Sequence, residues 1–378
     1  MNGSVTHVTV ARDDQVYEAF PDICLLENGK LLCVYRESDV HIATTSRIML
    51  TESEDGGKNW SQPREIVKRK SFINDRAVWH DPRIKYLNDG RLVLNCALQI
   101  FPDEAETPRF PESGSGYRTF LWFSEDKGKT WAGPNLTEIE GLCADRIYPV
   151  RDDLWLLAIQ RWSLRFPGGA MRVQVAHSFD KGDTWPVSAM VAEEDGVEHD
   201  EPSIIPLNDG RLLCVMRENT HTIRPSQYVI SEDEGKSWSK PRSTPFHGDR
   251  PSGGILNTGE ILVTYRNVKP AIGEKKLNVG RHPGTWGWLG DLDGISGLNG
   301  ESNFLEIERD SSGWHGDCGY SAWVQFDNDE ILCVYHHRGD APKSFIKKPL
   351  ATAWFPETSP NAWMGFRVRK PLINTVVY

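Results

Sequence analysis

The sequence predicts an all-β fold, namely a six-bladed β-propeller of four-stranded antiparallel blades in which residues 1–378 form a single domain. Two internal repeats lead to this prediction, and no helical periodicity appears between their copies. One repeat is a short turn and the other is a β-hairpin. Blades that each combine two hairpins around a common axis accommodate both repeats.

The first repeat is an eight-residue turn with the pattern S-x-D-x-G-x-[TSN]-W. An Asp side chain can accept hydrogen bonds from the backbone of its own turn, a Gly permits positive φ, and a Trp buries a large apolar surface. Each turn is thereby explained as a connection between strands, although an acidic loop could alternatively bind calcium. The copies are SEDGGKNW (53–60), SEDKGKTW (124–131), SFDKGDTW (178–185) and SEDEGKSW (231–238).

The second repeat is a β-hairpin in which two apolar strands flank a turn that is usually N/D-G, a strong hairpin signal. Aligned on this turn without gaps, six copies are found. They are FPDICLLENGKLLCVYR (20–36), DPRIKYLNDGRLVLNCA (81–97), DRIYPVRDDLWLLAIQR (145–161), EPSIIPLNDGRLLCVMR (201–217), RPSGGILNTGEILVTYR (250–266) and YSAWVQFDNDEILCVYH (320–336).

Three further segments complete the expected ring. Residues 4–11, SVTHVTVA, are typical of a strand that joins the last blade and closes the ring, and residues 310–314, DSSGW, resemble a degenerate copy of the turn. Residues 268–300 form the largest insertion, rich in Gly and containing Trp286 and Trp288. We expect an ordered loop over one face, either a surface excursion or a lid over a substrate.

The composition bears on partners and location. A formal net charge of −10 argues against nucleic acid and anionic membranes as partners, and no apolar stretch approaches the roughly 18 residues of a membrane span. Residues 1–14 lack the features of a secretory signal, which predicts a cytoplasmic protein unless a signal has been trimmed. The seven cysteines, among them Cys33, Cys214 and Cys333, lack metal-ligand spacing and are expected in the core. No metal or cofactor is expected, and the oligomeric state is not predicted.

Hairpin topology brings polar residues of all six repeats to one end of the predicted propeller. Each hairpin turns at one end, together with the turns of the first repeat, so its two free ends lie at the other end around the central channel. The first strands begin with Phe20, Asp81, Asp145, Glu201, Arg250 and Tyr320. The second strands end with Arg36, Ala97, Arg161, Arg217, Arg266 and His336, and Glu37, Asp39, His80, Arg83, His199, Asp200 and Glu218 are close in sequence.

The charges at this mouth have two explanations. Charged groups are expensive to desolvate unless they are paired, so the arginines and carboxylates could form a structural ion-pair belt that closes the channel. They could instead form a pocket for an anionic small ligand, because the planar guanidinium of arginine binds a carboxylate through two hydrogen bonds.

Tyr320 and Glu201 are the candidate catalytic pair. They are expected close together across the channel, where the carboxylate of Glu201 could take the phenol proton and make Tyr320 a nucleophile. A tyrosine suits an acidic substrate, whose carboxylate would repel an Asp or a Glu. The leaving oxygen also needs an acid with a raised pKa, for which Asp81, Asp39 and Asp200 are candidates.

These residues resemble the sialidases. The turn of the first repeat (the Asp-box of that family), the six hairpins, the GYS around Tyr320 and the hairpin from Glu201 to Arg217 carry the resemblance, which runs from about residue 15 to 338. It implies a six-bladed propeller and a glycosidase with Tyr320 as nucleophile and Glu201 as its base. Arg217 would be one of three arginines that hold the carboxylate of the sugar.

The sequence departs from the sialidase pattern at two linked places. Blade one has Ala19-Phe20-Pro21 where sialidases have Arg-Ile-Pro, and the last hairpin ends in Tyr335-His336 where they have Tyr-Glu. The first arginine and the Glu that steadies it are therefore both absent. Arg250 or Arg266 could be the third arginine. The other candidates for substrate binding are Arg36, Arg161, Asp145, His199, Asp200 and His336.

We therefore expect a divergent member of the superfamily: a retaining exo-glycoside hydrolase that acts on a terminal, acidic sugar of a small carbohydrate or glycan. A polysaccharide lyase that uses Tyr or His as base on a uronate is one alternative, suggested by His199 and His336. A non-catalytic carbohydrate-binding propeller is the other, suggested by the lost arginine.

Overall fold

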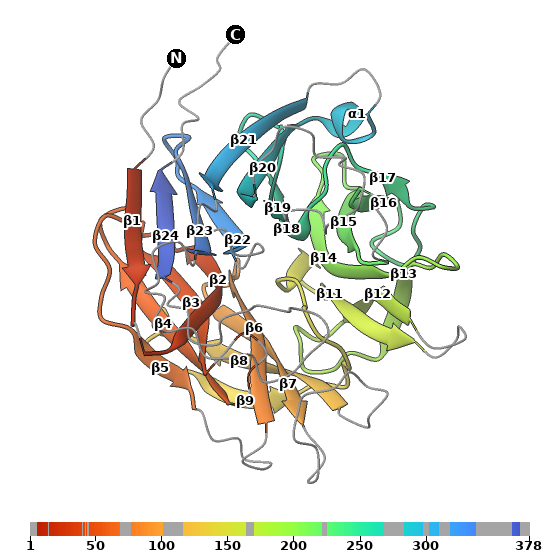
Figure 1. Ribbon diagram of the computed structural model, residues 1–378. Helices are drawn as coiled ribbons and strands as arrows, with labels where there is room; N and C mark the ends of the chain where they lie inside the picture. Colours follow the sequence, from red (N-terminus) through yellow and green to blue (C-terminus); the bar gives the residue numbers. More distant parts are fainter. Residues whose placement is uncertain are drawn as a thin grey trace.

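The computed structural model describes residues 6–13, 15–39, 41, 43, 45–68, 77–100, 116–163, 170–220, 225–267, 283–297, 302–309, 318–337 and 365–370. Within these residues, hydrogen bonding groups the strands into six four-stranded sheets that are arranged around a ring (Figure 1). Neighbouring strands in each sheet are antiparallel. The predicted all-β propeller of four-stranded antiparallel blades is confirmed.

The blades follow one another in chain order. Blade one is β2 (Tyr17–Leu25), β3 (Leu31–Ser38), β4 (Ser46–Ser53) and β5 (Arg64–Val67); blade two is β6 (Ala77–Tyr86), β7 (Leu92–Ile100), β8 (Gly116–Ser124) and β9 (Ala132–Leu136). Blade three is β10 (Tyr148–Arg151), β11 (Leu154–Ser163), β12 (Ala170–Ser178) and β13 (Val187–Ala192); blade four is β14 (His199–Pro206), β15 (Leu212–Glu218), β16 (Gln227–Ser231) and β17 (Arg242–Ser243). Blade five is β18 (Asp249–Ile255), β19 (Ile261–Asn267), β20 (Gly284–Gly290) and β21 (Ser302–Arg309), with a short helix α1 (Leu292–Ile295); blade six is β22 (Cys318–Gln325), β23 (Ile331–His337), β24 (Gly365–Lys370) and β1 (Thr6–Ala11).

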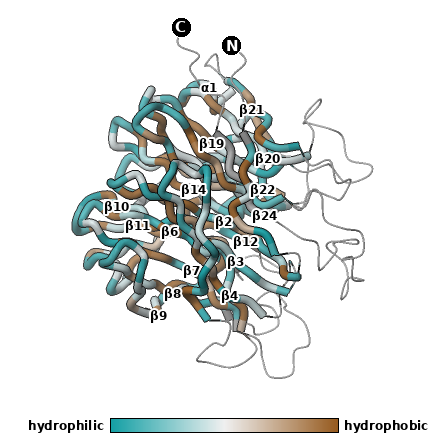
Figure 2. The backbone as a smooth tube through the Cα atoms, turned by 90° about the vertical axis from the view of Figure 1, so that its left-hand side faces the viewer, coloured by the Kyte–Doolittle hydropathy of each residue, from teal (hydrophilic) through white to brown (hydrophobic). Residues whose placement is uncertain are grey.

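The core lies between the faces of neighbouring blades. Leu32 and Leu50 of blade one, for example, pack in one cluster with Trp79, Leu94 and Phe120 of blade two, and all five are almost fully buried. Hydrophobic residues are accordingly concentrated inside the strands, whereas many turns are hydrophilic (Figure 2). Burying a side chain of this size contributes about 1.5–3 kcal/mol, so the interfaces between blades stabilise the ring.

The N-terminal strand closes the ring, as predicted. β1 pairs along its length with β24, which pairs in turn with β23 of the same sheet. Val10 and Ala11 of β1 are buried in a cluster that also contains residues of blade one. The first and last parts of the described chain therefore share one sheet.

Hydrogen bonds among their own residues stabilise the Asp-box turns. These bonds explain why Ser, Asp, Gly and Trp recur in each copy. In the second copy, Ser124 Oγ donates to Asp126 Oδ1 and accepts from Gly128 N, both at 2.9 Å. Asp126 also accepts from Thr130 N at 2.8 Å, and Trp131 Nε1 donates to the carbonyl of Gly128 at 3.2 Å. The other three copies repeat these contacts.

The Asp-boxes lie at the end of the ring where the inner hairpins turn. Arg151, beside the hairpin turn of blade three, forms an ion pair with Glu234 in the Asp-box of blade four. Arg64 of blade one similarly donates to the carbonyl of Gly128 in the Asp-box of blade two. The free ends of the inner strands consequently lie at the opposite end, as the topology predicted.

The expectation of a loop over residues 268–300 is wrong for its second half. Gly284–Gly290 form β20, the third strand of blade five, and both tryptophans are core residues: Trp288 is fully buried and Trp286 is nearly so. Period-2 patterning was hidden here because glycine stands at every third position of the strand, at 284, 287 and 290. Residues 268–282 and 298–300 lie outside the described residues, as do 310–314.

Two further expectations concern the chain as a whole. All seven cysteines are buried, as predicted for core residues. Within the described residues, no helix has the length and apolar character needed to cross a membrane.

Candidate active site

Six residues with a left-handed backbone stand at equivalent places in the six blades. They lie where each chain segment enters its inner hairpin, and in five blades the register of that hairpin shifts at this point, as in a β-bulge. Such a bulge redirects a side chain, at a backbone strain of about 1–3 kcal/mol for a non-glycine residue. The six are Phe20 (φ 58°), Asp81 (45°), Cys143 (52°), Glu201 (45°), Arg250 (49°) and Tyr320 (48°).

Blade three corrects the predicted ring. Its left-handed residue is Cys143, not Asp145. Leu142 pairs with Gln160, so Gln160 has the place that Arg217 has in blade four, where Asp200 pairs with Arg217. The chain from Leu142 to Gln160 is one residue longer than its counterpart in blade four, and the gapless alignment missed this extra residue.

The predicted placement of Arg161 and Asp145 at the mouth is therefore wrong. Arg161 is exposed and lies 3.7 Å from Glu140, another exposed residue. Asp145 accepts a hydrogen bond from the backbone N–H of Ile204 in blade four at 2.6 Å. Asp145 thus lies one layer further along the channel than the six left-handed residues.

Tyr320 and Glu201 meet across the channel. Tyr320 Oη donates to Glu201 Oε1 at 2.7 Å, and both residues are buried. Glu201 Oε2 accepts the backbone N–H of Arg250 at 2.7 Å and lies 3.3 Å from Nη1 of Arg217. Burial raises the pKa of Tyr320 well above its ordinary value, which Arg266 and Arg217 only partly oppose. The phenol therefore keeps its proton unless the neighbouring carboxylate removes it.

Arg217 and Arg266 lie side by side because both bind Asp249. Arg217 Nε is 3.0 Å from Asp249 Oδ1, and Arg266 Nη2 is 2.7 Å from Asp249 Oδ2. The guanidinium carbon of Arg266 is 4.6 Å from the centre of the Tyr320 ring, a cation–π distance. Of the two candidates for the third arginine, Arg250 and Arg266, it is thus Arg266 whose guanidinium lies beside the candidate catalytic pair.

Arg250 faces the other side of the channel. Its Nη1 donates to the carbonyl of Cys143 at 2.7 Å and its Nη2 to that of Ala144 at 2.9 Å. Cys143 Sγ donates to Asp81 Oδ2 at 3.1 Å. Burial raises the pKa of Asp81, but Arg250, His80 and Arg36 outweigh burial and hold that pKa below its ordinary value. Asp81 is therefore ionised and unsuited to donate a proton.

The resemblance would have put an arginine at Ala19, and it is the aromatic ring of the next residue, Phe20, that lies beside Tyr320. The ring of Phe20 lies 4.9 Å from Tyr320, 5.5 Å from His336 and 5.5 Å from His41. Arg36 covers Phe20, with its guanidinium carbon 4.4 Å from the ring centre, and its Nη1 lies 3.2 Å from His80 Nδ1. The positive charge of blade one is thus present, but it lies behind an aromatic ring and is almost fully buried.

Two carboxyl groups remain as candidate acids. Asp200 is buried, and its Oδ1 accepts the backbone N–H of Glu201 at 2.7 Å. Burial and the charge of Glu201 raise the pKa of Asp200 to about 8, so it holds a proton at neutral pH. Asp39 is half-buried just after β3 and lies close enough to Arg36 to interact with its charge. His199, a predicted substrate-binding residue, instead contacts a side chain of its own blade: its Nε2 lies 2.5 Å from Gln227 Oε1.

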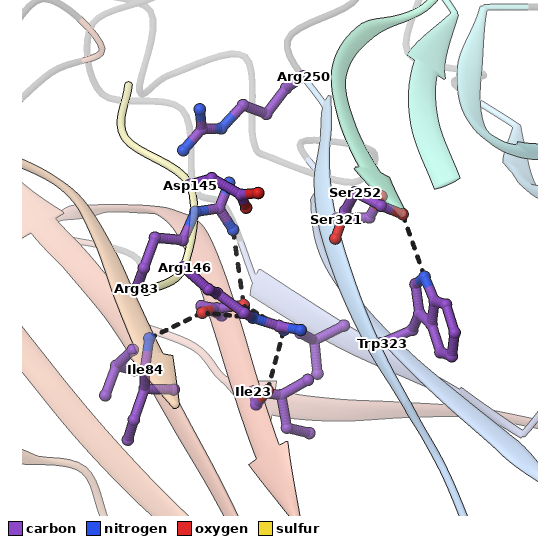
Figure 3. A network of polar contacts seen from close by, with 12 residues as sticks. Ile23, Arg83, Ile84, Asp145, Arg146, Arg250, Ser252, Ser321 and Trp323 are labelled. Atoms are coloured by element: carbon purple, nitrogen blue, oxygen red, sulfur yellow. Dashed lines mark hydrogen bonds and ion pairs between the residues drawn. The ribbon is translucent and has the colours of Figure 1, made fainter. Parts of the chain in front are cut away.

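A second layer of charges lies next to the six left-handed residues. Asp22 is fully buried and accepts from Arg146 Nε at 3.0 Å and from Ile84 N at 2.8 Å, while Arg83 lies 3.5 Å away. Figure 3 shows Arg83, Asp145 and Arg146 grouped together on the side of the channel that Arg250 also reaches. Asp22 and Arg146 are not among the mouth residues of the prediction, so this network is separate from the predicted ion-pair belt and does not choose between a belt and a pocket as the explanation of the mouth charges.

Comparison with known families places the chain. A family model described as a BNR repeat-like domain matches residues 8–187 and 123–333. The chain therefore belongs to the BNR repeat-like family. No curated protein matches it.

Solved structures show the same fold at low sequence identity. A protein of unknown function from Dyadobacter fermentans is 20% identical, with a TM-score of 0.73 over 97% of this chain and 99% of that one. A mutant of the NanB sialidase from Streptococcus pneumoniae is 14% identical, with a TM-score of 0.63 over 97% and 70%. The Trypanosoma rangeli sialidase is 12% identical, with a TM-score of 0.61 over 98% and 60%. The chain is thus a divergent protein with the sialidase fold.

Proposed function

We propose that the protein is a retaining exo-glycoside hydrolase that removes a terminal, acidic sugar. The observation that carries this proposal is the 2.7 Å hydrogen bond from Tyr320 Oη to Glu201 Oε1. A buried phenol bound to a carboxylate is a nucleophile with its base in place. Arg217 and Arg266 beside this pair supply positive charge for a substrate that carries a carboxylate.

The reaction would proceed in two steps. Tyr320 Oη attacks the anomeric carbon while its proton passes to Glu201. The glycosidic C–O bond breaks, and the leaving oxygen takes a proton from Asp200, to which we assign the role of acid. Water then attacks the anomeric carbon of the tyrosyl–sugar intermediate and gives its proton to Asp200. Tyr320 leaves and recovers its proton from Glu201, so the configuration of the sugar is retained.

The first experiment is a hydrolysis screen with 4-methylumbelliferyl glycosides of N-acetylneuraminic, glucuronic and galacturonic acid, and of rhamnose as a neutral sugar. For the substrate that is turned over, Tyr320→Phe should lower kcat by at least about 10³-fold, because the nucleophile is lost. Tyr35→Phe is the matched control: Tyr35 is also a buried tyrosine, and its Oη donates to the carboxyl group of Glu18 in blade one at 3.1 Å rather than to Glu201. Equal kcat in Tyr320→Phe and the control would refute the mechanism.

The product separates the proposal from its alternatives. Hydrolysis with retention gives the sugar in its original anomeric configuration, which proton NMR detects before mutarotation. A lyase would give an unsaturated uronate that absorbs in the near ultraviolet. Binding without turnover of any glycoside would favour a carbohydrate-binding propeller and would end the hydrolase proposal.

A further inference from the structure

Asp249 is the carboxylate on which both arginines of the site converge. It is the first residue of β18, directly before Arg250, and its two oxygens are divided between two neighbouring blades. Oδ1 lies 3.0 Å from Nε of Arg217 in blade four, while Oδ2 lies 2.7 Å from Nη2 and 3.2 Å from Nε of Arg266 in blade five. One carboxylate thus fixes two guanidinium groups relative to each other.

Each of these arginines also touches one member of the catalytic pair. Arg217 Nη1 lies 3.3 Å from Glu201 Oε2, and Arg266 stacks on the Tyr320 ring at 4.6 Å. The charges therefore alternate in sign from Glu201 through Arg217 and Asp249 to Arg266. Without the central negative charge, the two guanidinium groups would repel each other. Arg217 would then keep its ion pair with Glu201 but lose the one with Asp249.

Asp249 is ionised in this arrangement. Burial raises its pKa, but the charges of Arg217 and Arg266 outweigh burial and hold the pKa below its ordinary value. The side chains of Asp249 and Arg217 are 13% and 22% exposed, so this part of the site is open to solvent.

We infer that Asp249 is a positioning residue that makes Arg217 and Arg266 a clamp with one net positive charge, selective for a sugar with a single carboxylate over a doubly charged phosphorylated sugar. The inference rests on the proposed function, because it deepens the description of that substrate. A monoanion matches the charge of the clamp. A dianion leaves one negative charge uncompensated beside Glu201.

The test is binding to wild-type protein and variants by titration calorimetry, with D-glucuronate as monoanion, D-glucose 6-phosphate as dianion at pH 8, and D-glucose as neutral reference. Wild-type protein should prefer glucuronate. Asp249→Asn keeps the shape of the side chain but removes its charge, and should strengthen glucuronate binding about threefold and glucose 6-phosphate binding about tenfold. The second effect is larger because the electrostatic free energy scales with the charge of the ligand. Asp249→Glu should restore the preference for glucuronate.

Turnover provides the second readout. On an acidic substrate, Asp249→Asn should lower kcat by about tenfold or more while KM falls, because the arginines bind the anion more strongly but no longer hold Glu201 and Tyr320 in place. The matched control is Asp22→Asn, since Asp22 also binds two arginines, Arg146 and Arg83, but touches neither Glu201 nor Tyr320. The control should lower the melting temperature and leave the ligand preference unchanged.

The outcomes separate this inference from the proposed function. If Asp249→Asn shifts the preference towards the dianion but no glycoside is hydrolysed by wild-type protein, the clamp stands and the hydrolase proposal falls. If wild-type protein prefers glucose 6-phosphate, or if Asp249→Asn binds all ligands as wild type does, the clamp is refuted whatever the activity. The wild-type comparison decides the matter even if the variant does not fold.

Discussion

At the scale of single residues, the site depends on backbone conformation before it depends on chemistry. An aromatic ring, a carboxylate, a thiol, a guanidinium and a phenol stand on almost the same left-handed backbone at six places. In four blades the next residue is proline, as in Asp81-Pro82 and Glu201-Pro202, so the sequence marked these places. Cys143 is followed by alanine, and without the marker the alignment slipped to Asp145.

Other site residues were missed for a similar reason. Asp249 lies one residue before the hairpin repeat as the alignment delimited it, although Asp200 holds the same place in blade four and was considered. The pairing of Asp249 with Arg266 in the hairpin would have pointed to it. That it also binds Arg217 could not be predicted, because this contact joins two blades through side chains.

Gly319 is a place where one methyl group should disturb the site. Its φ is 83°, and a Cβ added there would lie 2.7 Å from Cβ of Arg266. In Gly319→Ala, either Arg266 or the backbone next to Tyr320 must shift, so the contact between these two residues changes and we expect KM for an acidic substrate to rise about tenfold or more. Gly29→Ala is the matched control, since Gly29 has φ 81° but open space around its Cβ position. Equal KM in both variants would contradict the expectation.

Asp200 should give the pH profile its alkaline limb. Its pKa of about 8 means that the proton needed by the leaving oxygen is lost as the pH rises above about 8. Asp200→Asn should remove this limb and lower kcat far more for a poor leaving group such as an alcohol than for 4-nitrophenol. Asp39→Asn, measured in parallel, should show neither effect; the reverse result would transfer the role of acid to Asp39.

The same raised pKa has a consequence for folding. The folded state holds a proton on Asp200 that the unfolded state releases near pH 4, so the stability from this group is complete below that pH. It is lost as the pH rises from about 4 to about 8. Chemical denaturation should therefore show a flatter dependence on pH over this range in Asp200→Asn than in wild-type protein.

At the scale of elements, the hairpin repeat predicted the inner strands and their common orientation, because apolar alternation and N/D-G turns are local signals. The outer strands carry weaker signals: β17 has only two residues, and β9 is fully exposed. β20 was not predicted as a strand because it contains Gly and Trp where β-branched residues are usual. The extra residue in blade three was hidden by its Asp152-Asp153 turn, which the alignment equated with longer turns.

The Asp-boxes should make the fold sensitive to acid. Hydrogen bonds from Thr130, through its side chain and its backbone N–H, hold the pKa of Asp126 at about 2. A lowered pKa gives stability that is present above the unfolded value near 4 and is lost as the pH falls towards 2. Asp126→Asn should lower the melting temperature at pH 5 and make it depend less on pH between 4 and 2. Asp183→Asn, at a variable Asp-box position, should behave like wild-type protein.

At the scale of the whole molecule, the ring is held by contacts from each blade to the next. Asp22 reaches the backbone of Ile84, Asp145 reaches Ile204, and Ser203 reaches Gly253. With the apolar clusters between blades, these bonds leave no blade with an independent core. The sequence repeats predicted the ring. Its closure joins β1, from the start of the described chain, to β22, β23 and β24 from its end.

Removal of the closing strand should therefore weaken the entire ring. In a protein that begins at Arg12, β24 loses its partner and the buried Val10 and Ala11 are lost from the cluster shared with blade one. We expect the melting temperature to fall by about 5 °C or more, and a synthetic peptide of residues 1–11 to raise it again. An unchanged melting temperature would show that β1 contributes little to closure.

The six left-handed residues occupy structurally equivalent positions that accept different side chains. Because the backbone at each is nearly the same whatever side chain it carries, a substitution there changes what faces the axis while the strands and the Asp-boxes at the far end stay as they are. Replacing the residue at one of these positions, for example Phe20 by an arginine, would exchange an aromatic contact for a charge in a single step. A scaffold of this kind can acquire new substrates one blade at a time.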